Sequence, residues 1–209
     1  MDEAGSTQSR ILQAAMAEFL EKDFSQASLR NIVKAAGVTT GAFYRYYPTK
    51  EALFEALVKP HADAVMAIFV QAISDFEALP AGDQTGAMGE VTTGCMGRML
   101  DYIYAHYDCF KLLICSANGT VYETFIHDLV ELEVESTYRF IAVLESLGYC
   151  VPPVDRELCH MIASGLFSGI FEMVVHDMQE AQARQRVAQL REFYTGGWER
   201  LFGIALFKI

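Results

Sequence analysis

The sequence lacks the long apolar runs and paired cysteines that mark membrane proteins and disulfide-linked proteins. Its longest stretch without Asp, Glu, Lys or Arg has 14 residues, 158–171, whereas a membrane-spanning helix needs about 20 apolar residues. The polar first ten residues contain no apolar signal core, so we expect a cytoplasmic protein without a membrane partner. The five cysteines include no CxxC pair, which favours reduced thiols over a disulfide framework.

Signatures of enzymes and metal proteins are also missing. The chain has no Ser-His-Asp order, no paired-carboxylate set and no glycine-rich phosphate loop, so we predict neither enzymatic activity nor a cofactor. Two pairs have the spacing of metal ligands on one helix, and no further ligands follow at a diagnostic distance. They are His106 with Cys109 and Glu172 with His176. We predict no metal site and leave open a redox or metal-sensing role for His106, Cys109 or Cys115.

Acidic residues are absent from one part of a chain that is acidic overall. The formal net charge is −11, from 16 Lys and Arg against 27 Asp and Glu. Residues 1–60 hold seven of each sign, so the rest of the chain carries the whole excess. Within residues 24–50 there is no acid, and four basic side chains occur: Arg30, Lys34, Arg45 and Lys50. This basic island predicts that contact with a polyanion is confined to one end of the protein.

Strand-like alternation is missing as well, because apolar residues recur at helical spacing almost throughout. We therefore predict an all-α protein of about nine helices. The predicted helices cover residues 7–21, 29–36, 39–46, 50–79, 86–105, 107–116, 121–147, 155–177 and 180–205. The loop LPAGDQTG, residues 79–86, is a candidate boundary region.

Residues 37–53, GVTTGAFYRYYPTKEAL, combine a helix-ending glycine with several rings and cations. Ser28 is a predicted N-cap for the helix before this segment, because its hydroxyl can accept from a free first-turn amide. Gly37 suits the left-handed position that ends that helix. Two short helices joined by such a turn form a helix-turn-helix, whose second helix fits the major groove of DNA.

The predicted second helix and the start of the helix after it offer four sets of residues suited to DNA binding. Small side chains let its backbone approach DNA, and hydroxyls with free amides at its start can hold a phosphate. A tyrosine and an arginine can reach bases or phosphates, and a lysine beyond them can hold another phosphate. In that order, the residues are Gly41 and Ala42, Thr39 and Thr40, Tyr44 and Arg45, and Lys50. Phe43 and Tyr47 are expected to pack inward, which leaves Tyr44, Arg45 and Tyr46 outside.

Several spaced motifs follow one another over residues 10–57: R-I-L-x-A-A, the aromatic Phe19, S-L-R-x-I, A-A-G-V and G-x-x-Y-x-Y-Y-P-x-K-E-A-L. This run resembles the DNA-binding domain of the TetR/AcrR family of bacterial transcriptional regulators. By position, the resemblance implies that Arg30, Thr39, Thr40, Gly41, Tyr44, Tyr46 and Lys50 face DNA, and we add Ser28, Ala42 and Arg45. The sequence departs from the family where Thr40 replaces a common Lys, which weakens one phosphate contact, and where Tyr47 replaces a common Phe.

The resemblance implies three N-terminal helices for DNA and a larger C-terminal domain that binds an inducer and dimerises. We accordingly predict a helix-turn-helix DNA-binding domain, 1–52, and a ligand-binding and dimerisation domain, 53–209, linked by the fourth helix. The expected partners are a palindromic double-stranded DNA operator, a second copy of the chain and a small apolar or aromatic effector. The predicted function is a homodimeric repressor released by its inducer. The alternatives are an activator, a ligand-independent regulator of the same fold, or a small all-helical enzyme or carrier.

The last two helices are expected to form the dimer interface, since they carry long apolar stripes and the resemblance implies dimerisation through them. Gly165 and Gly169 have the spacing that permits close helix packing. The predicted interface residues are Leu158, Ile162, Gly165, Leu166, Gly169, Ile170 and Met173, followed by Leu190, Tyr194, Trp198, Leu201 and Phe202. Burial within one subunit is the alternative interpretation of the same stripes.

An apolar ligand cavity is expected in the C-terminal domain, because methionine and aromatic side chains suit adaptable pockets. Tyr102 and His106 are four residues apart and share a helical face, which favours them as a pair. The predicted lining residues are Met96, Met99, Tyr102, His106, Phe110, Tyr122, Phe125 and Phe167. Packing in an ordinary core is the alternative for each of them.

Overall fold

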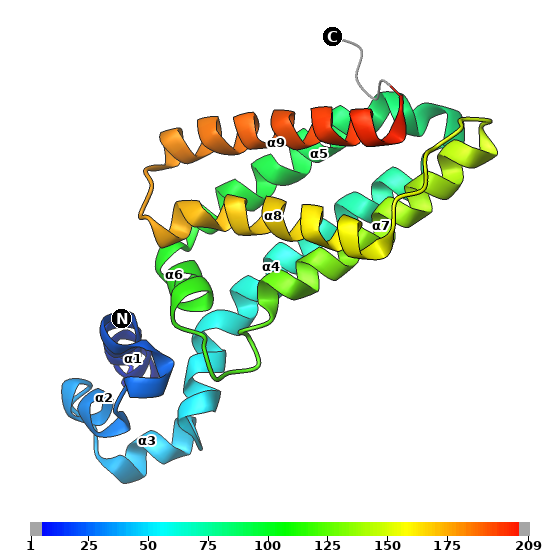
Figure 1. Ribbon diagram of the computed structural model, residues 1–209. Coiled ribbons are helices and arrows are strands. Elements are labelled where there is room, and N and C mark those ends of the chain that lie inside the picture. Colours follow the sequence, from blue (N-terminus) through cyan, green and yellow to red (C-terminus); the bar gives the residue numbers. More distant parts are fainter. Residues whose placement is uncertain (1–5, 205–209) are drawn as a thin grey trace. The chain divides into compact units, whose positions relative to one another are not determined.

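The computed structural model describes residues 6–204, and every regular element within them is an α-helix (Figure 1). The predicted all-α class with nine helices is confirmed for this part of the chain. The helices are α1 Thr7–Gln26, α2 Leu29–Ala35, α3 Thr40–Tyr46, α4 Lys50–Glu77, α5 Ala81–Ala105, α6 Tyr107–Cys115, α7 Phe125–Ser146, α8 Arg156–Val175 and α9 Glu180–Phe202.

Two helix starts differ from the sequence-based prediction. α5 begins five residues earlier than predicted, so most of the expected loop LPAGDQTG is helical. Pro80 precedes its first turn, where proline's missing amide is not needed, and the Pro80 carbonyl accepts from Asp83 N–H at 2.8 Å. The Gln84 side chain donates to the Leu79 carbonyl at 3.1 Å and closes the turn after α4. α7 begins four residues later than predicted, because turns that include Gly119 at φ +81° precede it.

The chain folds into two compact units. Unit 1 contains residues 6–64 and 106–125, and unit 2 contains residues 65–105 and 126–204. Both units contain part of α4, whereas α6 belongs to unit 1 although it follows α5 of unit 2. This division differs from the predicted domains, whose assignment to DNA binding and to ligand binding with dimerisation stays a prediction.

Unit 1 is built around an aromatic cluster between α1 and the start of α4. The rings of Phe19, Phe24 and Phe54 meet pairwise, with centroids 5.2 to 6.0 Å apart. Asp23 interrupts α1 at φ +60°, a conformation that residues other than glycine rarely adopt. The next residue, Phe24, donates its N–H to the carbonyl of Ser116 at 3.1 Å. The C-terminal end of α6 is therefore attached to the end of α1.

The turn between α1 and α2 is organised by Glu18, for which no role was predicted. Its carboxylate accepts from Ser28 N–H at 3.0 Å, from the Asn31 side chain at 3.1 Å and from Lys22 at 3.2 Å. Burial raises the pKa of this carboxyl, but the hydrogen bonds outweigh burial and hold the pKa below its usual value. The predicted hydroxyl cap of Ser28 is wrong, because its side chain makes no capping hydrogen bond. The turn is held through the Ser28 backbone instead.

Unit 2 packs α5, α7, α8, α9 and the rest of α4 around a second apolar core. Phe76, Phe140, Leu144 and Phe202 are buried in it. The Phe140 ring lies 5.5 Å from Phe76 and 6.5 Å from Phe202, measured between centroids. Trp198 stacks on Phe202 at 5.1 Å. The C-terminal end of α9 is therefore connected to α4 and α7 through rings.

Among the described helices, α8 is the one long and apolar enough to cross a membrane by length and composition. Eight of its 20 residues are buried in unit 2. Asp155 caps its start by accepting from Leu158 N–H at 2.8 Å. Part of the apolar composition of α8 is thus accounted for by the core that it lines.

Two glycines of α8 permit the close approach of α9 within the same chain. A Cβ atom on Gly165 would lie 2.5 Å from the hydroxyl oxygen of Tyr194, and one on Gly169 would lie 3.0 Å from Leu190 Cδ2. The small residues predicted for the dimer interface therefore serve contacts inside one subunit. Their part in a dimer stays a prediction.

We expect the effect of Gly165→Ala to depend on the Tyr194 hydroxyl. Alanine gains about 1 kcal/mol over glycine inside a helix, but here its methyl group displaces Tyr194 at a cost of roughly 1–3 kcal/mol. In a Tyr194→Phe background, the effect of Gly165→Ala on the free energy of unfolding is expected to be about 1–2 kcal/mol more favourable than in the parent. Urea unfolding of the four proteins measures this coupling. Additive effects would show that Tyr194 avoids the methyl group without cost.

Candidate nucleic-acid interface and ligand cavity

α2 and α3 form the helix-turn-helix of unit 1. Gly37 follows α2 at φ +62°, the left-handed conformation predicted for it. Thr39 caps α3, since its Oγ1 accepts from Ala42 N–H at 3.2 Å. Thr49 caps α4 in the same way, with Ala52 N–H at 3.1 Å. The left-handed Gly37 is confirmed, and together with the two threonine caps it separates α3 from both neighbouring helices.

The side chains of α3 divide between core and surface as predicted. Phe43 is fully buried and Tyr47 is 6% exposed, whereas Tyr44 is 52% and Tyr46 44% exposed. Arg45, between these two tyrosines, is also exposed. The Tyr44 ring meets the edge of Phe43 with centroids 5.3 Å apart, which restricts its motion. α3 thus presents two rings and one guanidinium to solvent.

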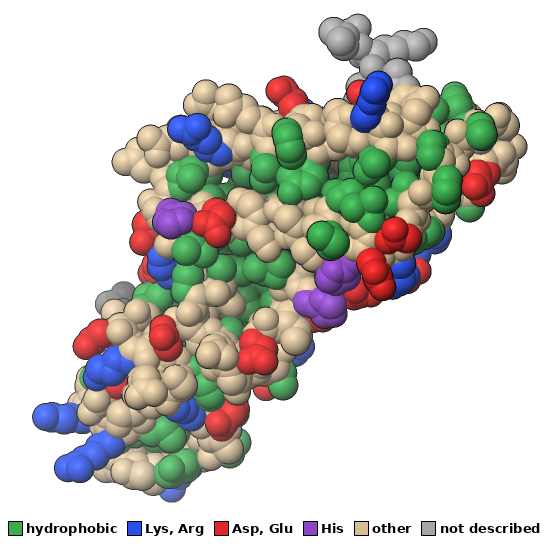
Figure 2. Space-filling view, in the orientation of Figure 1, with side chains coloured by type: hydrophobic (Ala, Val, Ile, Leu, Met, Phe, Trp, Pro, Cys, Tyr) green, Lys and Arg blue, Asp and Glu red, His purple; other side chains and the backbone are tan. Residues whose placement is uncertain are grey.

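The other predicted DNA-binding residues lie on α2 or α3, at the starts of these helices, or, for Lys50, at the start of α4. Figure 2 shows Lys and Arg side chains protruding from the part of unit 1 that holds these helices. Arg30, Thr39, Thr40 and Gly41 are exposed, and Ser28, Ala42 and Lys50 are half-buried. The contact of these residues with DNA stays a prediction.

Lys50 has an internal role that its sequence position did not indicate. Its ammonium donates to the carbonyls of Phe24 at 2.7 Å, Ala27 at 3.3 Å and Ser25 at 3.4 Å. The same nitrogen lies 4.5 Å from the centre of the Phe24 ring. These groups come 23 to 26 residues earlier in the chain, beyond the reach of any local pattern. Lys50 therefore holds the end of α1 to the start of α4.

We expect Lys50→Met to lower the free energy of unfolding by about 2 kcal/mol, because three carbonyls lose a charged donor and Phe24 loses its cation. Urea unfolding followed by circular dichroism measures the change. Lys34→Met is the matched control, since Lys34 is exposed on α2 and its removal should change stability by less than about 0.5 kcal/mol. Equal stability of both variants would show that the internal contacts of Lys50 do not stabilise the fold, and would leave the predicted phosphate contact as its role.

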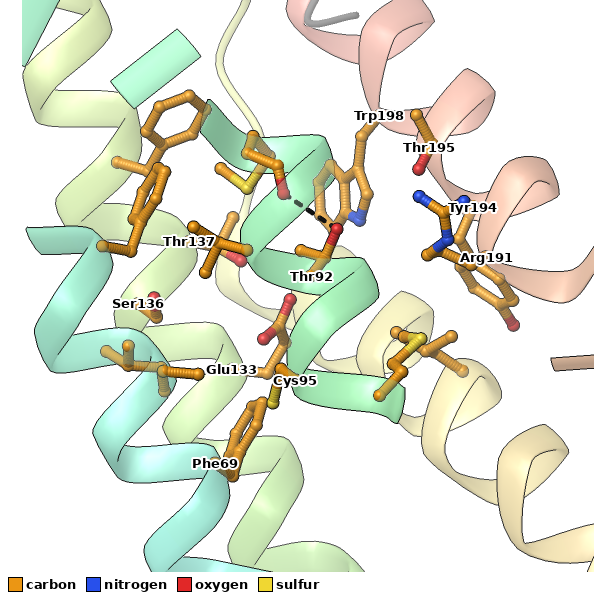
Figure 3. A pocket seen from close by; sticks show the side chains of 18 of the residues that line it. Phe69, Thr92, Cys95, Glu133, Ser136, Thr137, Arg191, Tyr194, Thr195 and Trp198 are labelled. Atoms are coloured by element: carbon orange, nitrogen blue, oxygen red, sulfur yellow. Dashed lines mark hydrogen bonds between the residues drawn. The ribbon is translucent and has the colours of Figure 1, made fainter. Parts of the chain in front are cut away.

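Unit 2 contains a cavity of about 160 Å³ among α4, α5, α7, α8 and α9 (Figure 3). Its walls are largely apolar and aromatic, with a few hydroxyls and two charged side chains. The lining residues from α4 and α5 are Phe69, Ala72, Ile73, Phe76, Met88, Val91, Thr92, Cys95, Met96 and Met99. Those from the last three helices are Glu133, Ser136, Thr137, Phe140, Leu166, Phe167, Ile170, Arg191, Tyr194, Thr195, Trp198 and Phe202.

The structure brings together some of the predicted ligand residues and separates others. Met96, Met99 and Phe167 line this cavity, whereas Tyr102 does not. Five residues predicted for the dimer interface line it as well: Leu166, Ile170, Tyr194, Trp198 and Phe202. An apolar stripe shows that one face of a helix is covered, but it does not show what covers that face. The sequence therefore could not distinguish a cavity wall from a dimer interface.

The remaining predicted ligand residues belong to unit 1: His106, Phe110, Tyr122 and Phe125. There the His61 ring lies 4.5 Å from His106 and 6.3 Å from Phe110, measured between centroids. Burial, aided by His106, lowers the pKa of His61. Burial raises the pKa of Tyr122 to about 12, with Glu55 and Asp63 adding to it. These side chains are part of the packing of unit 1.

Glu133 is a cavity residue for which no role was predicted. Figure 3 shows its carboxyl group in the cavity beside Cys95, with Glu133 carried by α7 and Cys95 by α5. Burial raises the pKa of Glu133 to about 7, because an ionised carboxylate is poorly solvated among apolar walls. A sequence signal did exist, since Glu133 continues the i, i+3, i+4 stripe of Leu129, Val130 and Val134 on α7. A carboxyl group on an apolar stripe indicates either a buried pair or a ligand-binding group.

Cys95 and Cys109 are poorly suited to thiolate chemistry. Burial raises the pKa of Cys95 to about 11, and burial together with Asp108 raises the pKa of Cys109. Both changes disfavour the reactive thiolate. Of the two pairs with metal-ligand spacing, Glu172 and His176 contact each other, with Oε2 and Nε2 2.8 Å apart.

The fold and the exposed face of α3 define an all-helical protein with an N-terminal helix-turn-helix. Residues 11–57 match the model of the family described as bacterial regulatory proteins, tetR family. Over these residues the chain therefore matches the tetR family, which confirms the resemblance noted over residues 10–57.

The relatives share mainly this domain. The HTH-type transcriptional regulator UidR of Escherichia coli K12 is 35% identical over 71 residues, which cover 34% of this chain and 36% of UidR. The uncharacterized HTH-type transcriptional regulator YvdT of Bacillus subtilis is 44% identical over 50 residues, covering 24% of this chain and 26% of YvdT. The chain is thus matched over only about a third of UidR and a quarter of YvdT.

Solved structures resemble the chain over nearly its whole length. The tetR-family transcriptional regulator PfmR of Thermus thermophilus has a TM-score of 0.58 at 17% identity, covering 87% of this chain and 96% of PfmR. The transcriptional regulator FadR of Bacillus subtilis, in complex with stearoyl-CoA, has a TM-score of 0.53 at 15% identity and the same coverages. At such identities the likeness shows that the fold is shared.

Proposed function

We propose that this protein is a homodimeric transcriptional repressor that leaves a palindromic operator when a small molecule binds its cavity. The observation that carries the proposal is α3 of a tetR-family domain, with Tyr44, Arg45 and Tyr46 exposed. One such helix reads only a few base pairs, whereas two related by symmetry read half-sites about one helical turn or more apart. Access to chromosomal DNA implies a cytoplasmic location.

Exposed apolar side chains on α8 and α9 support a dimer. Leu158 is 37%, Val175 42%, Met161 69% and Phe193 75% exposed, and Figure 2 shows hydrophobic side chains at the surface over these helices. Their burial against a second copy would remove apolar surface from water. Met161 and Phe193 would thereby join Leu158 in the interface predicted from the sequence.

The cavity supports an effector with a compact apolar body and one basic or hydrogen-bond-donating group. Its volume of about 160 Å³ is near the ~150 Å³ of an engineered apolar cavity that binds benzene. Glu133 offers a carboxyl group inside these walls, and an amine beside it would favour the ionised carboxylate. We therefore infer that aromatic or cyclic amines are the first class of effector to test.

The effector would act through α4, which has residues in both units. A movement of α4 would change the separation of the two recognition helices in the dimer and lower operator affinity. To take a dimer mostly off DNA, the effector must prefer the released conformation by about 3–5 kcal/mol.

Binding of the purified protein to the DNA upstream of its own gene tests the proposal. Fluorescence anisotropy at two salt concentrations should show at least about 1000-fold preference over random sequence and a steep loss of affinity with salt. A repressor releases this DNA when an amine effector is added, whereas an activator binds it more tightly. If the protein binds no specific site in this DNA, and no specific sequence can be selected with it from a random-sequence pool, a regulatory role would be contradicted.

A further inference from the structure

Outside the cavity, three side chains of α7 and α8 gather their nitrogen and oxygen atoms at one point of the surface. His127 and Glu131 are four residues apart on α7, and His160 comes from α8. One ligand atom from each residue lies within 4.8 Å of the other two. Figure 2 shows histidine side chains beside acidic and basic ones over these helices.

The distance between two of the three ligand atoms matches that of a transition-metal site. Zinc binds histidine nitrogen and carboxylate oxygen at about 2.0–2.2 Å with tetrahedral geometry, which places two ligand atoms about 3.3–3.5 Å apart. Glu131 Oε1 and His160 Nε2 are 3.3 Å apart. The His127 ring, whose centroid lies 5.5 Å from that of His160, is exposed and places a ligand nitrogen within 4.8 Å of the other two ligand atoms.

Neighbouring residues hold two of the three ligands in place. Ser164 Oγ lies 3.3 Å from His160 Nδ1, and in the tautomer in which Nδ1–H donates to this oxygen, Nε2 carries the lone pair that a metal ion needs. Arg156 Nη2 holds Glu131 Oε2 at 2.9 Å, so the other carboxylate oxygen is directed to the histidines. Arg156 also binds Glu135 at 2.6 Å, which fixes the guanidinium. Orienting hydrogen bonds of this kind commonly surround the ligands of metal sites.

We propose that His127, Glu131 and His160 bind a divalent transition-metal ion of the zinc type. Two imidazole nitrogens and one carboxylate oxygen suit zinc, and three protein ligands leave one coordination position for water. The bound ion would connect α7 to α8, the helix whose Leu158 and Met161 flank His160 and are exposed. Sequence spacing alone did not reveal this site, because His160 lies 29 residues beyond Glu131 and in a different helix.

Titration of the metal-free, full-length protein with Zn²⁺ in a calorimeter tests the proposal. A Cys115→Ser, Cys150→Ser background removes the two exposed thiols. We expect one ion per chain, with a micromolar or lower Kd, and at least tenfold weaker binding in His127→Gln and in His160→Gln. Ser164→Ala should weaken binding by about tenfold. At about 100 times the Kd, zinc should raise the midpoint of thermal unfolding by roughly 5–10 °C.

The matched control is His176→Gln, which removes a histidine paired with a glutamate four residues away in the same unit. It should bind Zn²⁺ as the parent does. Co²⁺ provides a second readout, since its visible bands should indicate four-coordinate nitrogen and oxygen ligands and disappear in His160→Gln. Zinc binding that persists in both histidine variants, or no binding below about 100 µM, would overturn the proposal.

Discussion

A Tyr44→Ala, Arg45→Ala double variant is expected to bind the operator at least about 100-fold more weakly than the parent. An arginine that reads a guanine edge contributes roughly 1–3 kcal/mol of discrimination, and the dimer presents the residue twice. Tyr44 adds a ring that is half exposed and supported by Phe43. Anisotropy titration on the operator and on random DNA measures the loss. Binding to random DNA should fall much less, because phosphate contacts elsewhere remain.

The control for this experiment is Tyr149→Ala, Lys59→Ala, which also removes one exposed ring and one exposed cation. Neither of these residues is predicted to contact DNA, so operator affinity should stay within about twofold of the parent. Circular dichroism of both double variants checks that the helices are intact. Equal losses on operator and random DNA would mean that Tyr44 and Arg45 contact only the phosphate backbone.

Unfolding of the protein is expected to become easier as the pH rises through 7, because Glu133 ionises inside the cavity. Burial raises the pKa of Glu133 from 4.5 to about 7, so between these values the folded protein holds a proton that the unfolded chain has released. The folded state is therefore favoured at low pH, and this contribution is lost as the pH rises towards 7. At about 1.4 kcal/mol per pKa unit, the full loss is about 3 kcal/mol.

Glu133→Gln separates this contribution from all other titrations. The variant should not lose stability through this ionisation. The difference in free energy of unfolding between the variant and the parent, measured with urea, should therefore shift in favour of the variant by about 2–3 kcal/mol from pH 5.5 to pH 8.5. Glu145→Gln, at an exposed position near the end of the same helix, should follow the parent at both pH values. Parallel pH dependences of the parent and Glu133→Gln would show that Glu133 is solvated in the folded protein. Loss of amine binding in Glu133→Gln would independently support the effector class.

The helix-turn-helix was predictable because its determinants are local. The Thr39 cap, the left-handed Gly37 and the inward Phe43 each follow from positions a few residues apart. Lys50 and Glu18 could not be assigned in this way, since each binds groups at least ten residues away that only the folded chain brings near. Local patterns thus predict the helices, but not the polar contacts that fasten them together.

The cavity was predicted less well because five helices contribute to it. Met96, Met99 and Phe167 were found through their residue types, whereas Tyr194 and Trp198 were assigned to the dimer interface. All five lie on helical stripes that must be covered, and periodicity gives the direction of a side chain rather than the identity of its neighbour. The assignment needed the packing of α9 against α8, which depends on two glycines.

The two roles proposed for α9 also limit how such a protein can diversify. Tyr194 and Trp198 line the cavity on the same helix that carries the exposed Phe193, so a substitution that reshapes the cavity there also risks the proposed pairing of subunits. Positions such as Thr92 and Ser136 line the cavity from α5 and α7 and belong to neither proposed interface. Descendants that recognise new compounds should therefore accumulate their changes first on α5 and α7, with α9 changing last.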